Sequence, residues 1–136
     1  MANRGAYNWA KENHDLILRI GFGIFLLIWG LDRFFRAEDW ATESLMGHFY
    51  GNLGMQVVFV AGLGIVQVLI ALSFFSNILV KYSSLLLLAM LIVSTIITIQ
   101  PMMNYLINGG APIPAILFSD HFPLLAGGWA IFAHSK

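Results

Sequence analysis

Four apolar runs, each about as long as a membrane-crossing helix, dominate this chain. They cover residues 16–35, 55–75, 80–100 and 113–134. A helix that crosses a hydrocarbon core of about 30 Å needs about 20 residues, at a rise of about 1.5 Å per residue. Only 10% of the residues are charged, against about 25% in ordinary soluble domains. We therefore predict an all-α membrane protein, in which one domain (residues 1–136) forms four transmembrane helices packed as an antiparallel bundle.

The fourth run is the least regular, because it contains the stretch FSDHFP at residues 118–123. A helix that crossed from Ile113 would place Asp120 in mid-membrane, at a cost of at least about 2.5 kcal/mol. The sequence favours another arrangement, in which the Gly and Pro residues of 109–114 break the chain. Residues 112–118 then form a short re-entrant or interfacial segment before the last helix.

Two interpretations of Asp120 and His121 follow from that arrangement. In the first, Ser119 or Asp120 caps a short final helix over about 120–134, with Pro123 in its first turn, where a missing N–H is tolerated. In the second, Asp120 orients or deprotonates His121 in an outward-facing pocket, because a histidine beside a carboxylate can handle protons or bind a quinone oxygen. The capping interpretation is the favoured one.

Basic residues are unevenly distributed between the two sides of a four-span arrangement. Five fall on the side of the termini and two on the opposite side. The five are Arg4, Lys11, Arg19, Lys81 and Lys136, and the two are Arg33 and Arg36. Because basic residues concentrate on the cytoplasmic side, we predict a multi-pass protein of a bacterial-type inner membrane with both termini in the cytoplasm. The loops over about 36–54 and 101–112 then face outward.

Small and polar residues recur at helical spacing within each run. Such residues mark contact faces in membranes, because close backbone approach and hydrogen bonds hold helices together in lipid. The expected faces are Arg19, Gly23, Leu26 or Leu27 and Gly30 in the first run; Gly64, Gln67 and Ala71 in the second; Ser84, Leu88, Leu91, Thr95 and Thr98 in the third; and Gly127 or Gly128 in the fourth. Packing is the favoured role of these residues.

Composition excludes several kinds of chemistry. The chain has no Cys and a formal net charge of zero, so thiol redox chemistry, thiolate metal sites and nucleic-acid binding are not expected. Of the four histidines, His14 and His134 fall on the inner side of the predicted arrangement, and His48 and His121 on the outer side. Two such pairs would suit a two-haem protein, but His14 precedes the first run, His48 lies in a loop and His134 is two residues from the C-terminus, so haem is not expected. No spacing typical of a metal site is present.

The first run, LILRIGFGIFLLIWGLDRFF, resembles the opening helix of the DoxX-like membrane proteins. The matching positions are Arg19, Gly23 and the Gly-x-x-basic element that ends at Arg33, where Lys is common in the family. The second run resembles the family's second helix through Gly64 and Gln67, although an acid often stands at the position of Gln67. The resemblance extends to chain length and four-span plan. It implies a membrane redox neighbourhood, with a quinone as the cofactor to consider.

Two classes of function follow from these observations. The first is an accessory subunit of a membrane-bound, quinone-linked redox complex, which binds the lipid bilayer and larger membrane subunits. The second is a stand-alone quinone-dependent oxidoreductase or small-molecule carrier. The polar residues that could line a quinone pocket are Arg19, Gln67, Asp120 and His121. Arg19 either holds its helix at the interface or pairs with a headgroup, a quinone oxygen or Gln67.

Overall fold

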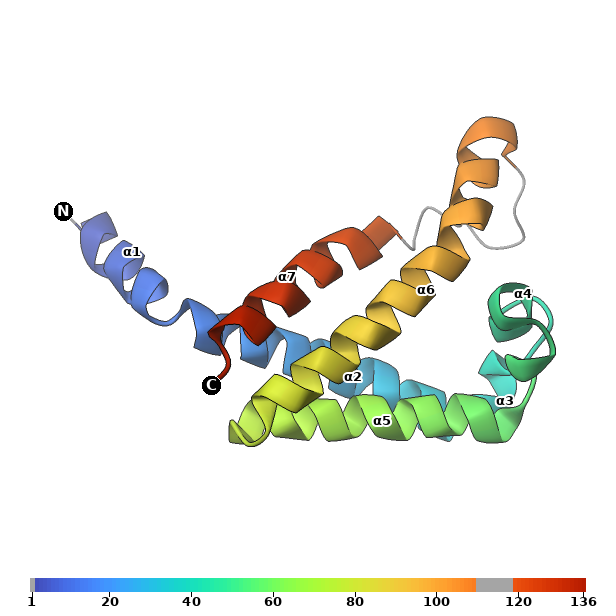
Figure 1. The fold of residues 1–136 in the computed structure, drawn as a ribbon, viewed down its shortest axis with the longest axis horizontal. Coiled ribbons are helices and arrows are strands. Elements are labelled where there is room, and N and C mark those ends of the chain that lie inside the picture. Colours follow the sequence, from blue (N-terminus) through green and yellow to red (C-terminus); the bar gives the residue numbers. More distant parts are fainter. Residues whose placement is uncertain (1, 110–118) are drawn as a thin grey trace.

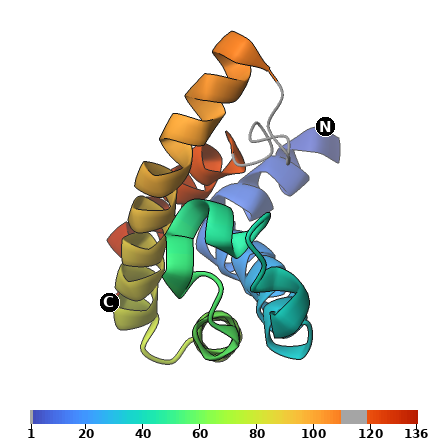
Figure 2. The same ribbon diagram turned by 90° about the vertical axis from the view of Figure 1, so that its right-hand side faces the viewer.

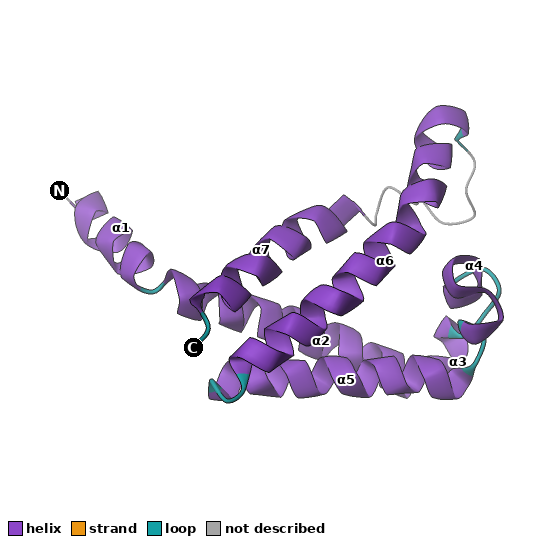
Figure 3. Cartoon of the chain, in the orientation of Figure 1, coloured by secondary structure: helices purple, strands orange, loops and turns teal. Residues whose placement is uncertain are grey.

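The computed structural model describes residues 2–109 and 119–136, and these residues form helices with short connections and no strand (Figures 1 and 3). The helices are α1 (Ala2–Glu12), α2 (His14–Phe35), α3 (Ala37–Trp40), α4 (Met46–Tyr50), the short 3₁₀ helix η1 (Gly51–Leu53), α5 (Val57–Ser76), α6 (Val80–Asn108) and α7 (His121–His134). The predicted all-α class is confirmed for this part of the chain.

Three of these helices are long and apolar enough to cross a membrane. They are α2, α5 and α6, with 22, 20 and 29 residues, and an 18-residue stretch of each has a mean hydropathy of 1.6, 2.5 and 2.2, respectively. They coincide with the first three predicted spans, and three such helices are the feature expected of an integral membrane protein. The short helices α3, α4 and η1 occupy the loop that was predicted between the first two spans.

Helix α6 extends further than its apolar pattern predicts. The third span was expected to end near Gln100, yet α6 continues through Pro101 to Asn108. Proline removes one backbone donor and crowds the preceding turn, but the residues that follow it, such as Met102, Met103 and Leu106, are good helix formers. Figure 1 shows the orange end of α6 turned relative to its yellow part, as expected for a helix that contains an internal proline.

Helix α7 is shorter than the fourth predicted span. It has 14 residues, or about 21 Å at about 1.5 Å per residue, which is short of a hydrocarbon core of about 30 Å. Pro123 lies in its first turn, as predicted. The predicted re-entrant or interfacial segment, residues 112–118, lies outside the described residues. A fourth crossing therefore stays a prediction.

The most extensive helix–helix contact among the described residues joins α2 and α5. The two helices lie side by side and run in opposite directions (Figures 1 and 2). At Gly30 an added Cβ would lie 2.8 Å from the carbonyl oxygen of Gly64, and at Gly64 it would lie 2.6 Å from that of Gly30. Both positions therefore require glycine, because the two backbones touch there with no side chain between them.

Helices α6 and α7 form the second pair, which lies across the first (Figure 1). At Gly127 of α7 an added Cβ would lie 2.6 Å from the ring of Phe22 in α2, and at Gly128 it would lie 3.1 Å from Leu88 in α6. Side chains of all four long helices meet in one apolar core. Its buried members are Phe22, Leu26, Ile70, Ala71, Phe74, Val80, Leu87, Leu91 and Ile131.

The predicted contact faces agree with the buried residues. The buried positions named in the prediction are Gly23, Leu26 and Gly30 in α2, Gly64, Gln67 and Ala71 in α5, Ser84, Leu88, Leu91 and Thr98 in α6, and Gly128 in α7. Helical spacing of small residues therefore located these interfaces correctly.

Candidate functional site

The four predicted site residues do not converge on one pocket. Arg19 belongs to α2, and its side chain contacts the C-terminal end of α5. Gln67 lies in the middle of α5, and Asp120 and His121 lie at the start of α7. An open groove of about 730 Å³ lies between α5 and α6, and apolar side chains such as Leu69 line most of it. None of the four residues lines that groove.

His121 joins a carboxylate to a hydroxyl group. Its Nδ1 lies 3.0 Å from Oδ1 of Asp120, and its Nε2 lies 2.8 Å from Oγ of Ser94 in α6. The imidazole is 13% exposed, whereas the Asp120 side chain is 46% exposed. A neutral imidazole that donates its Nδ1–H to Asp120 accepts, at Nε2, a hydrogen bond that the Ser94 hydroxyl donates. The three residues thus form a hydrogen-bonded chain that reaches from the exposed carboxylate to α6.

This arrangement corrects the favoured interpretation of Asp120. The backbone of Asp120 is already in the right-handed helical region, and its side chain makes no capping hydrogen bond. A cap needs a non-helical residue whose side chain accepts a bond from the first turn. The carboxylate instead contacts the neighbouring imidazole, which is one part of the alternative interpretation; the outward-facing pocket and a cap by Ser119 stay predictions. Ser94 was not among the predicted site residues, because 27 positions separate it from His121 in the sequence.

Chemically, the Ser94–His121–Asp120 chain can hold and move a proton. A hydroxyl, an imidazole and a carboxylate in this order are the groups that activate a serine in hydrolases. The same groups can deliver a proton to a bound acceptor, since a half-buried imidazole with an oriented tautomer can act as a general acid or base. The chain also ties α6 to α7.

Arg19 binds the C-terminal end of α5. Its Nη1 donates to the carbonyl oxygen of Phe74 at 3.2 Å and to Oδ1 of Asn77 at 2.7 Å. Asn77 follows α5 with a positive φ of 58°, a conformation in which asparagine often ends a helix. A cation is favourable there, because the last carbonyl groups carry partial negative charge. The predicted pairing of Arg19 with Gln67 is not found.

Arg19→Ala is expected to lower the free energy of unfolding by about 1–3 kcal/mol, since hydrogen bonds to charged groups contribute about 1.5–3 kcal/mol. Unfolding of the detergent-solubilised protein by SDS, followed by circular dichroism, measures the change. Arg4→Ala is the matched control, because Arg4 is exposed on α1. An equal loss of stability in both variants would show that the change in net charge, rather than the loss of the Arg19 hydrogen bonds to the end of α5, is responsible.

Gln67 is the one predicted site residue within the helix core. Its side chain is 8% exposed and it shares the face of α5 that also carries Gly64 and Ala71. Among the described residues its Oε1 has no hydrogen-bond partner. A buried amide acceptor usually has a partner, so this oxygen is a place where a polar group of a ligand, a water molecule or another part of the chain can bind.

Arg33 lies beside two aromatic rings that also contact each other, since the ring centres of Trp29 and Trp40 are 5.6 Å apart. Its guanidinium carbon is 5.6 Å from the ring centre of Trp29 and 5.4 Å from that of Trp40. The indole Nε1–H of Trp40 donates to Oδ2 of Asp32 at 2.7 Å, which fixes the second ring. Cation–π contacts of this kind stabilise by about 0.5–2 kcal/mol. They hold α3 against the end of α2.

Arg36, which follows α2, forms the exposed ion pairs at that end of the molecule. It lies 3.1 Å from Asp39 and 3.5 Å from Asp32. The hydrogen bond to Asp39 and the negative charge of Asp32 raise the pKa of Arg36 above its ordinary value. Exposed pairs add little to stability, so we assign no binding role to this cluster.

No family model, curated protein or solved structure matches this chain. The resemblance to the DoxX-like proteins therefore stays a prediction that rests on short motifs. The structure gives those motif residues packing roles: Gly30 and Gly64 touch each other, and Arg19 binds the end of α5.

Proposed function

We propose that this chain is a small integral membrane accessory subunit of a membrane-bound redox complex, to which it contributes packing and anchoring. The link to quinone-dependent redox chemistry derives from the DoxX-like resemblance alone. In this proposal α2, α5 and α6 are three of four spans, and residues from about 113 to the end of α7 make the fourth. Both termini lie in the cytoplasm of a bacterial-type cell, as the basic residues favour.

An accessory role is supported by the contacts of the predicted polar residues, which join helices to one another. Arg19 donates a hydrogen bond to the C-terminal end of α5, and His121 of α7 is hydrogen-bonded to Ser94 of α6. Gln67 lies on a packing face of α5. A catalyst normally directs several such groups into one concave pocket. Here they are distributed over three places and hold helices in position, as expected of a protein that presents surfaces to partners.

The length of α6 supports the same proposal. Its 29 residues span about 43 Å, whereas a hydrocarbon core is about 30 Å thick. The final turns of α6 carry exposed apolar side chains, with Leu106 57% and Ile107 73% exposed. An apolar helix end that reaches beyond the bilayer suits contact with a larger membrane subunit.

One observation favours the second class, a stand-alone quinone-dependent oxidoreductase or small-molecule carrier. The Ser94–His121–Asp120 chain can transfer a proton, and reduction of a quinone consumes protons. In that case Asp120→Asn would remove the carboxylate that orients His121, and turnover would fall by about 10⁴-fold, as in serine hydrolases. His121→Ala would abolish turnover.

Extraction from the native membrane in a mild detergent, through a tag on Lys136, separates the two classes. For an accessory subunit we expect stoichiometric recovery with larger redox subunits, identified by mass spectrometry. Asp120→Asn should preserve this assembly, because an amide can still accept the Nδ1–H bond of His121. Recovery of the chain alone with a bound quinone, and loss of quinone turnover in Asp120→Asn, would establish the second class.

A further inference from the structure

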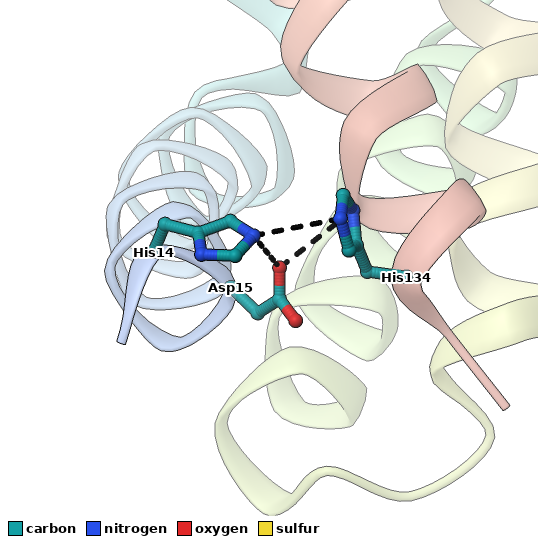
Figure 4. Close-up of side chains that lie close together, drawn as sticks. All are labelled: His14, Asp15 and His134. Atoms are coloured by element: carbon teal, nitrogen blue, oxygen red, sulfur yellow. Dashed lines mark hydrogen bonds and ion pairs between the residues drawn. The ribbon is translucent and has the colours of Figure 1, made fainter. Parts of the chain in front are cut away.

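A second polar cluster lies where the start of α2 meets the end of α7 (Figure 4). His14 and Asp15 come from the first turn of α2, and His134 is the last residue of α7. Nε2 of His14 lies 2.9 Å from Oδ1 of Asp15 and 3.5 Å from Nε2 of His134. One ligand atom of each residue lies within 4.8 Å of the other two. In Figure 4 the three side chains point toward one another.

Both imidazoles are oriented by backbone carbonyl groups. Nδ1 of His14 lies 2.8 Å from the carbonyl oxygen of Lys11, and Nδ1 of His134 lies 2.7 Å from that of Ala130. A carbonyl oxygen only accepts hydrogen bonds, so each Nδ1 carries the proton. In the neutral rings each Nε2 then presents a lone pair. Such a backbone bond at the other ring nitrogen is typical of histidines that bind metal ions.

The carboxylate completes a set of three electron-pair donors. Oδ1 of Asp15 is shielded from solvent and has no hydrogen bond with favourable geometry among the described residues. Oδ1 lies 2.9 Å from Nε2 of His14, but the angle between the two groups does not suit an N–H···O hydrogen bond. Two lone-pair nitrogens and an anionic oxygen repel one another unless a proton or a cation lies between them.

We propose that Nε2 of His14, Nε2 of His134 and Oδ1 of Asp15 bind a divalent first-row transition-metal ion, of the Zn²⁺ or Fe²⁺ class. Metal ions bind these donors at about 2.0–2.2 Å, which separates neighbouring donors by about 3–3.5 Å. The distances of 2.9 Å (His14 to Asp15) and 3.5 Å (His14 to His134) fit that requirement, while Oδ1 of Asp15 lies 3.7 Å from the His134 ring at Nδ1. Two imidazoles and one carboxylate favour such ions over Mg²⁺ and Ca²⁺, which prefer oxygen ligands.

The site has room for further ligands and links the two helix pairs. The side chains of His14, Asp15 and His134 are 50%, 44% and 48% exposed, so water can complete the coordination, as in sites with three protein ligands. Because α2 belongs to one helix pair and α7 to the other, a bound ion holds the end of α7 against the start of α2. The site is separate from the Ser94–His121–Asp120 chain, and its test is independent of the proposed function.

Metal titration of the whole chain tests the site. The protein is purified in mild detergent through an N-terminal tag without histidine, stripped with a chelator, and titrated with Co²⁺ and then Zn²⁺. We expect one Co²⁺ per chain, visible by its absorption, and displacement by Zn²⁺. His14→Ala and His134→Ala should each weaken Co²⁺ binding by more than about 100-fold. Loss of a residue that only orients a metal ligand costs up to about 100-fold in affinity, and loss of the ligand itself should cost more. His48→Ala, at an exposed histidine of α4, should bind as the unaltered protein does.

A second variant makes the result independent of folding defects. The chain has no Cys, so His134→Cys should keep a ligand and add a thiolate-to-cobalt charge-transfer band that no other residue can supply. Substoichiometric binding by the unaltered protein would overturn the proposal, leaving a His14–Asp15 ion pair only. Full affinity in His14→Ala and His134→Ala, or cobalt binding by His134→Cys without the band, would also overturn it.

Discussion

Gly64→Val is expected to separate α2 from α5 and to lower the free energy of unfolding by at least about 3 kcal/mol, at the upper end of the usual cost of overpacking. The Cβ alone would lie 2.6 Å from the carbonyl oxygen of Gly30 and 2.9 Å from the backbone nitrogen of Phe34. Both atoms belong to the α2 backbone, so no side chain can rotate away. The helices must move apart, and SDS-induced unfolding followed by circular dichroism measures the loss.

Gly62→Val is the matched control, since it lies on the same helix and has no atom within 4 Å of an added Cβ. Valine and glycine differ by less than about 1 kcal/mol in helix propensity, so this variant should remain close to the unaltered protein. Similar losses in Gly62→Val and Gly64→Val would mean that the α2–α5 backbone contact does not exist.

Leu26→Ala is expected to destabilise the protein by about 2–5 kcal/mol, the range found for large-to-small substitutions in packed cores. Leu26 is 2% exposed and belongs to the core shared by the four long helices. The side chain is surrounded on all sides, so its removal leaves a cavity. Unfolding in SDS and the rate of proteolysis in detergent both report the loss.

Leu31→Ala provides the comparison on the same helix, because Leu31 is 40% exposed. Lipid tails or detergent fill the space that its side chain leaves, so we expect a change of about 1 kcal/mol or less. If both leucines contributed equally, α2 would have no inward face, and the packing described above would be wrong.

The contact faces of the helices could be predicted from the sequence because they depend on local periodicity. Gly23, Gly30, Gly64 and Ala71 are buried as their spacing indicates. Helical spacing fixes which residues share a face, and small residues show which face allows close approach. The helices α2, α5 and α6 were likewise evident from composition and length.

Features that depend on distant parts of the chain could not be predicted. Ser94 meets His121 across 27 positions, and His14 meets His134 across 120. Neither spacing corresponds to a known motif, so each residue alone indicated only a polar position or a cap. The continuation of α6 through Pro101 was missed for a local reason: proline weakens a helix without always ending it.

The distance along the chain between contacting residues sets the order in which the protein can assemble. Gly30 and Gly64 are 34 positions apart, so at about 5–20 residues per second the ribosome needs about two to seven seconds to supply the partner of α2. A helix can wait in lipid for that time, because its own backbone hydrogen bonds are satisfied. His134 reaches His14 only after about 6–24 seconds, by the same rate. The contact between His14 and His134 therefore forms late in assembly, and only on a chain whose synthesis has passed α7.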